Sequence, residues 1–208
     1  MGRALATWLL ITAAAATPAA NPREVVEAAV VRVINVLEES QRGRSEPELA
    51  ARMTRDRVRL EIRRIATDLF DFPEIGRRAL GRHWAGRTAA EQTEFIALFT
   101  DLLERAYVGK LEAYAGERIV YLGETVDGDY ATVRCRILTK RRSETTLDYR
   151  LHRNGAHWKV YDLLIDGVSF VSTYRAEFNR IIQAHSWDEL MDRLRKKRIE
   201  ARTVLDRG

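Results

Sequence analysis

Residues 156–182, AHWKVYDLLIDGVSFVSTYRAEFNRII, place a strand and a helix in one uninterrupted segment, and this most constrains the fold. The part from Trp158 to Ile165 is rich in aromatic and β-branched residues, which is typical of a strand. After Asp166 and Gly167 the apolar positions recur every three or four residues, which predicts an amphipathic helix. The chain therefore passes from sheet to helix through a short apolar corner. Such a corner either closes a core or forms the rim of an apolar pocket.

The rest of the chain divides at Gly116 into a helical half and a strand half. Before Gly116, a capping residue followed three positions later by glutamate predicts helix starts at Asn21, Ser45 and Thr88. After Gly116, alternating segments separated by Asp-Gly and Asn-Gly turns predict four antiparallel strands. These strands are expected at 119–122, 131–138, 145–152 and 158–165, followed by a helix over 169–185 and a short one that begins at Ser186. Helices, then a sheet, then helices predict an α+β fold in one domain.

The first 20 residues read as a secretory signal peptide. Arg3 precedes an apolar run over 4–16, which is shorter than the roughly 20 residues that a membrane span needs. We expect cleavage between residues 16 and 20, a folded domain over 21–194, a basic disordered tail over 195–208, and a mature protein in the periplasm. The alternative is an alanine-rich, amphipathic start to a helix of a cytosolic protein.

Composition excludes several classes of function. Lys and Arg number 35 against 30 Asp and Glu, a mild and interspersed surplus that does not indicate a nucleic-acid-binding protein. The single Cys135 excludes an intramolecular disulfide and a multi-cysteine metal site. The four histidines lack metal-ligand spacing, so we expect no metal and no cofactor.

Catalytic signatures are sparse. The sequence around Val168 lacks the second glycine of a nucleophile elbow. Asp162 is a candidate general base, because an apolar site raises the pKa of a carboxylate. The alternative is that Asp162 hydrogen-bonds the following loop or pairs with an arginine such as Arg175. We expect the second role, because no partner group for catalysis is identifiable, and therefore we do not expect an enzyme.

Two long stretches carry a family resemblance. They are DFPEIGRRALGRHWAGRTAAEQTEFIALFTDLLERAYVGKLEAY at 71–114 and LDYRLHRNGAHWKVYDLLIDGVSFVSTYRAEFNRII at 147–182. Together they resemble the MlaC family of periplasmic phospholipid carriers, also called toluene-tolerance or ABC-transporter auxiliary proteins. The resemblance implies N-terminal helices packed on a curved four-stranded antiparallel sheet, with C-terminal helices, enclosing an apolar pocket for phospholipid acyl chains.

The resemblance also implies partners and a role. Phospholipid would be the cargo of a monomeric shuttle that maintains outer-membrane lipid asymmetry. Its partners would be an outer-membrane lipoprotein–porin complex and an inner-membrane ABC transporter with an MCE-domain subunit. The other hypotheses are a carrier of another membrane lipid such as a hopanoid, an α+β half-barrel enzyme using Asp162, and an adaptor with a filled core.

The expected lipid-binding residues come from two sources. The family motif implies Tyr107, Tyr149 and Val168 at the pocket or its mouth. The assignment of apolar faces adds six more residues, namely Trp84, Phe99, Leu103, Val133, Leu151 and Val160.

Overall fold

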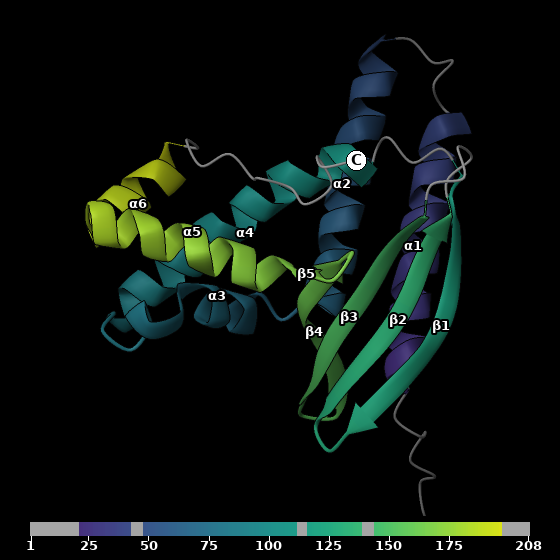
Figure 1. Cartoon of the computed structure of the whole chain (residues 1–208). Helices are drawn as coiled ribbons and strands as arrows, with labels where there is room; N and C mark the ends of the chain where they lie inside the picture. The colour runs from purple at the N-terminus through teal and green to yellow at the C-terminus, as the bar shows by residue number, and fades with distance from the viewer. Residues whose placement is uncertain (1–20, 43–47, 112–115, 139–143, 197–208) are drawn as a thin grey trace, which may run out of the picture.

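A computed structural model describes residues 21–42, 48–111, 116–138 and 144–196 of the chain. The helices are α1 (Pro22–Arg42), α2 (Glu48–Leu69), α3 (Phe72–Leu80), the short 3₁₀ helix η2 (Gly81–His83), α4 (Ala89–Leu111), α5 (Phe170–Ala184) and α6 (Trp187–Arg195). The strands are β1 (Arg118–Asp127), β2 (Tyr130–Leu138), β3 (Glu144–Asn154), β4 (His157–Ile165) and β5 (Val168–Ser169). Figure 1 shows α1 and α2 behind the sheet and the helices α3 to α6 gathered beside it.

Local capping chemistry explains where the helices begin. The side chain of Asn21 accepts a hydrogen bond from the Glu24 amide at 2.8 Å, and Glu24 in return accepts from the Asn21 amide at 3.1 Å. Thr88 and Glu91 make the same reciprocal pair. Each pair satisfies amide groups that a helix start leaves without partners, so both predicted starts are confirmed. The start predicted at Ser45 lies outside the described residues.

The sheet is antiparallel and has the strand order β1-β2-β3-β4-β5. The predicted α+β class is confirmed, but the expected number of four strands is wrong, because the two-residue strand β5 pairs with the end of β4. The parallel bridge between Phe70 and Val160 covers another part of the outer β4 edge. A covered edge cannot pair with a strand of a second chain. The strand β5 and the bridge at Phe70 therefore protect the β4 edge from intermolecular pairing.

Two large apolar clusters and a small third one, formed by Leu37, Val58 and Ile62, make up the interior. The sheet cluster lies between the inner face of the sheet and the helices α1 and α2, and includes Val26, Ile65, Val133, Leu151 and Val160. The helical cluster joins α3, α4, α5 and α6, and its buried members are Ile75, Ala79, Leu80, Phe95, Phe99, Leu102, Leu103, Val171, Tyr174, Phe178, Ile181, Leu190, Met191 and Leu194. Phe70, at the end of α2, packs against both clusters and connects them.

The ends of the expected domain are partly described. The predicted signal peptide at 1–20 lies outside the described residues, as do residues 197–208 of the predicted tail. The beginning of that tail is ordered, because α6 continues to Arg195, whose guanidinium pairs with Glu94 of α4 at 2.8 Å. None of the helices within the described ranges is both long enough and apolar enough to cross a bilayer.

Candidate functional site

The predicted lipid-binding residues divide between the two clusters. Four belong to or pack against the helical cluster, namely Trp84, Phe99, Leu103 and Tyr107. Four belong to the sheet cluster, namely Val133, Tyr149, Leu151 and Val160. The ninth, Val168, lies in β5, is 42% exposed and belongs to neither cluster. The structure therefore brings these residues together as two groups, with Val168 at the corner of the chain between them.

Aromatic rings hold the helical cluster together. The Phe99 ring lies 5.0 Å from the rings of Tyr174 and Phe178, in edge-on arrangements that aromatic pairs prefer. The Tyr107 ring lies 5.4 Å from Phe170, the first residue of α5. Burial raises the pKa of the Tyr174 phenol, so its hydroxyl stays protonated at any physiological pH.

A single cross-strand row spans the sheet on its inner face. In register, Tyr121 lies opposite Cys135, Cys135 opposite Leu147, Leu147 opposite Ile165, and Ile165 opposite Val168. Because neighbouring strands lie about 4.8 Å apart, this row is roughly 19 Å long. It is apolar throughout except for the Tyr121 hydroxyl, and it reaches the exposed edge of the sheet at Val168.

Tyr121 belongs to this surface but is not one of the nine residues expected to bind lipid. Its hydroxyl oxygen is buried and has no hydrogen-bond partner among the described residues. Burial is also the main cause of the raised pKa of this phenol. An unpaired buried hydroxyl costs about 1–3 kcal/mol, so this group would gain from an acceptor brought by a ligand. The only signal in the sequence was its position in an alternating strand.

The corner between β4 and α5 is fixed by Asp162. Its carboxylate, 5% exposed, accepts hydrogen bonds from the Leu163 amide at 2.9 Å, the Ser169 hydroxyl at 2.7 Å and the Val171 amide at 3.0 Å. Arg150 lies 3.7 Å away. The predicted hydrogen bonding to the loop is confirmed, but the ionic partner is Arg150 instead of Arg175. With its oxygens engaged in this way, Asp162 ties strand to helix and is not placed as a general base.

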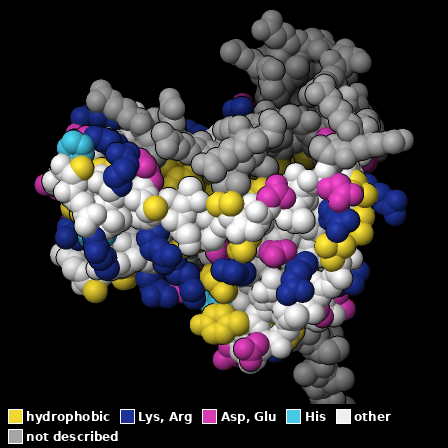
Figure 2. Space-filling model, in the orientation of Figure 1, with side chains coloured by type: hydrophobic (Ala, Val, Ile, Leu, Met, Phe, Trp, Pro, Cys, Tyr) yellow, Lys and Arg dark blue, Asp and Glu magenta, His cyan; other side chains and the backbone are white. Residues whose placement is uncertain are grey.

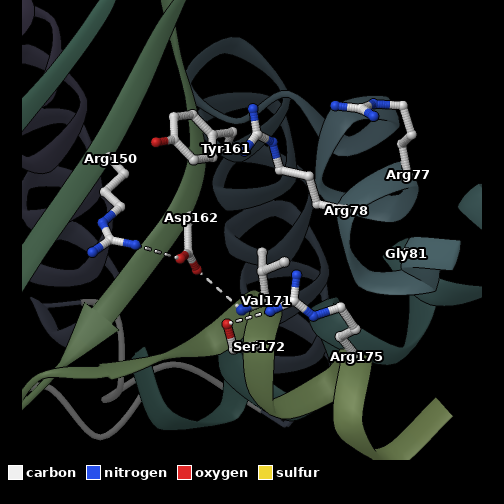
Figure 3. A pocket seen from close by; sticks show the side chains of 9 residues that line it. All are labelled: Arg77, Arg78, Gly81, Arg150, Tyr161, Asp162, Val171, Ser172 and Arg175. Atoms are coloured by element: carbon white, nitrogen blue, oxygen red, sulfur yellow. Dashed lines mark hydrogen bonds and ion pairs between the residues drawn. The ribbon is translucent and has the colours of Figure 1, made fainter. Parts of the chain in front are cut away.

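A polar hollow of about 420 Å³ lies on the other face of the sheet, where β3 and β4 meet α3 and α5. It is lined by Arg77, Arg78, Gly81, Arg150, Tyr161, Asp162, Val171, Ser172 and Arg175. Figure 2 shows Lys and Arg side chains gathered where the helices adjoin the sheet, and Figure 3 shows the four arginines of the hollow around its rim. This site was not predicted from the sequence.

The fold and the two large clusters define a class: an α+β protein in which helices cover one face of an open antiparallel sheet and bury an apolar row that ends at an exposed edge. Known proteins agree with this class. The sequence model of the MlaC protein family matches residues 31–196, most of the chain. The chain therefore belongs to the MlaC family, and the predicted resemblance is confirmed.

Individual relatives agree with this assignment. The intermembrane phospholipid transport system binding protein MlaC of Haemophilus influenzae is 25% identical over 140 residues, which cover 64% of this chain and 65% of that protein. The match thus spans just under two thirds of the relative. The phospholipid-binding protein of Ralstonia solanacearum, solved in complex with a phospholipid, superimposes with a TM-score of 0.73 at 24% identity and covers 86% of this chain and 97% of that one. This second likeness supports the fold.

Proposed function

We propose that this protein is a carrier of phospholipid between membranes and that the acyl chains lie along the cross-strand row. The observation that carries this proposal is the row itself, which runs over all five strands and ends at the 42% exposed Val168. Burying methylene groups contributes about 0.8 kcal/mol each, so an acyl chain needs apolar surface more than specific contacts. The names of the MlaC relatives, which describe phospholipid binding and transport, agree with this cargo.

The expected pocket residues keep their assignment within the proposal. Tyr149 and Val133 lie opposite each other in the adjacent cross-strand row, and Leu151 and Val160 form a pair one step further along the sheet. Tyr107 approaches the corner from α4 through its contact with Phe170. Phe99 and Leu103 in the helical cluster, and Cys135 and Ile165 in the row, are almost fully buried and would contact lipid only if the covering helices move apart.

The carrier would work in the periplasm, between an outer-membrane lipoprotein–porin complex and an inner-membrane ABC transporter with an MCE-domain subunit. Such a role requires export, so the mature protein should begin between residues 17 and 21. Osmotic-shock release followed by N-terminal sequencing tests this expectation. An uncleaved chain that remains with the cytoplasmic fraction would contradict it.

The central experiment is the identification of lipid in protein purified from its own host. Extraction and mass spectrometry should find phospholipid in near-stoichiometric amount. Another membrane lipid, such as a hopanoid, would keep the carrier role and change the cargo. A folded protein that contains no lipid would contradict the proposal.

Substitutions at two exposed valines distinguish a specific effect on lipid binding from the general effect of adding a surface charge. Val168→Glu places a charge at the end of the row and should lower lipid occupancy severalfold, because a charge beside an acyl chain is costly to desolvate. The matched control is Val31→Glu, at a 53% exposed valine of α1 that belongs to none of the apolar clusters. Equal occupancy in both variants would remove Val168 from the site. Because both positions are exposed, neither change should greatly alter stability.

A further inference from the structure

The polar hollow carries a surplus of positive charge. Four arginines line it. Among the described residues, the carboxylates that pair with them are Asp162 in the lining and Glu74 beside it, which leaves a formal surplus of two positive charges. Each guanidinium carries five N–H donors. The contacts among the described residues use no more than two donors on any of these arginines. The hollow therefore has unused donors as well as unbalanced charge.

Contacts from α3 hold two of the arginines in place. Glu74 accepts two hydrogen bonds from Arg77 at 2.6 Å and one from Arg78 at 2.6 Å. The Arg78 guanidinium also lies 4.0 Å from the centroid of the Tyr161 ring. The ring contact and the ion pairs restrict these long side chains before a ligand binds. Binding would therefore cost less side-chain conformational entropy.

The third arginine depends on a glycine. Gly81, at the end of α3, has a φ of 56°, and a Cβ built on it would lie 3.1 Å from Cδ of Arg175. The missing side chain thus lets the methylene stem of Arg175 cross the end of α3 from α5. The Arg175 guanidinium then donates to the Ser172 hydroxyl at 3.2 Å, inside the hollow.

The fourth arginine is positioned by an irregularity in the sheet. Arg150 pairs in register with Asp162, whereas Leu151 pairs with Val160, so Tyr161 is an extra residue on β4. This β-bulge places both Tyr161 and Asp162 on the outer face with Arg150. Arg150 is therefore directed into the hollow, while its neighbours Tyr149 and Leu151 face the sheet cluster.

We propose that this hollow is a binding site for a phosphate group, separate from the apolar row on the other face of the sheet. Guanidinium forks match the oxygens of phosphate, and a phosphate of up to two negative charges balances the surplus. A single carboxylate carries one charge and would leave part of it uncompensated. The 420 Å³ volume lies within the roughly 300–1,000 Å³ of small-ligand sites, so a phosphate ester fits as well as a free ion.

The test titrates inorganic phosphate into the full purified protein at low ionic strength, with calorimetry as the readout. Saturable binding to one site is expected, weakening as salt is added. Arg77→Gln and Arg175→Gln should each lower the affinity about tenfold or more, because each removes a charge-assisted donor. The matched control is Arg180→Gln on the same helix as Arg175, an exposed arginine that pairs with Glu177 outside the hollow. Arg180→Gln should change the affinity less than twofold.

A second arm distinguishes the source of the phosphate. Vesicles of phosphatidic acid in phosphatidylcholine are sedimented with the protein, with and without competing inorganic phosphate. Sedimentation that phosphate suppresses supports a lipid headgroup as the ligand, and binding of phosphate without sedimentation supports a free ion or ester.

Three outcomes would overturn the proposal. They are the absence of saturable phosphate and vesicle binding, equal affinities in the Arg175→Gln and Arg180→Gln proteins, and stronger binding of a glutamate-rich peptide than of phosphate at this site. Arg77→Gln guards against misfolding, because Glu74 keeps Arg78 as its partner. Lipid that copurifies with the protein should be unchanged in these variants, so the phosphate site and the lipid row can fail independently.

Discussion

Replacing Asp162 with alanine should show how much of the fold depends on the corner between β4 and α5. Its carboxylate accepts three hydrogen bonds, two of them from the backbone amides of Leu163 and Val171. Truncation leaves the amide of Val171, a residue 4% exposed, without its partner in the protein. The Ser169 hydroxyl is only half-buried and can turn toward solvent.

The expected loss of stability in Asp162→Ala follows from these hydrogen bonds. A hydrogen bond to a charged group contributes about 1.5–3 kcal/mol, and a buried unpaired amide costs about 1–3 kcal/mol. These two contributions cannot simply be added, because both count the same hydrogen bonds. The 3.7 Å pair with Arg150 adds little, since that arginine is largely exposed to water. We expect Asp162→Ala to lower the free energy of unfolding by about 3–4 kcal/mol.

Urea denaturation followed by circular dichroism measures this loss. With a slope of about 2 kcal/mol per molar urea, the midpoint should fall by roughly 2 M without a change of slope. Asp162→Asn keeps the shape and one acceptor oxygen, and should lose about half as much. The control is Asp129→Ala, whose carboxylate is 78% exposed and pairs with Arg153 at 3.6 Å, and which should change stability by less than about 0.5 kcal/mol. If Asp162→Ala and Asp129→Ala have the same midpoint, the corner is held by packing alone and the reasoning fails.

Three further outcomes are expected. Asp71→Ala should cost about 2–3 kcal/mol in thermal or urea unfolding, because its buried carboxylate caps α3 at the Glu74 amide and accepts side-chain hydrogen bonds from the β3–β4 hairpin. Hydrogen bonding from Arg77, and then from Arg78, holds the pKa of Glu74 below its usual 4.5, so its contribution is complete above that pH and is lost as the pH falls through the lowered pKa. The stability difference between the wild type and Glu74→Gln should therefore shrink from pH 6 to pH 3. Burial raises the pKa of the Cys135 thiol to about 12, so a maleimide should label it slowly in the native protein and quickly in urea, and rapid native labelling would contradict its burial.

The features that could be predicted from the sequence are those that local chemistry determines. The capping pairs at Asn21 and Thr88 have the hydrogen bonds that their spacing requires. The alternation over residues 145–152 predicts that Leu147, Tyr149 and Leu151 share one face of the strand, and all three are buried. The strand β5 was missed, because two residues are too few to show any period.

The basic hollow could not be predicted for two reasons. Its arginines come from α3, β3 and α5, and each resembles the solvated face of its own element. The bulge at Tyr161 is also invisible in the sequence, because simple alternation from Trp158 and Val160 would direct Asp162 to the inner face. One extra residue instead places Asp162 beside Arg150. Which of the nine expected residues contact lipid stays a prediction.

The same bulge explains how β3 and β4 can contribute both to the apolar face of the sheet and to the basic hollow. In β3, Tyr149 and Leu151 supply the apolar face while Arg150, between them, supplies the hollow. In a regular β4, Asp162 would enter the sheet cluster, where a carboxylate without donors is costly. The bulge removes this conflict and places the carboxylate where the start of α5 can satisfy it. The strand-to-helix corner and the division between apolar and basic faces therefore have a common structural cause, so removing the extra residue should disturb both surfaces at once.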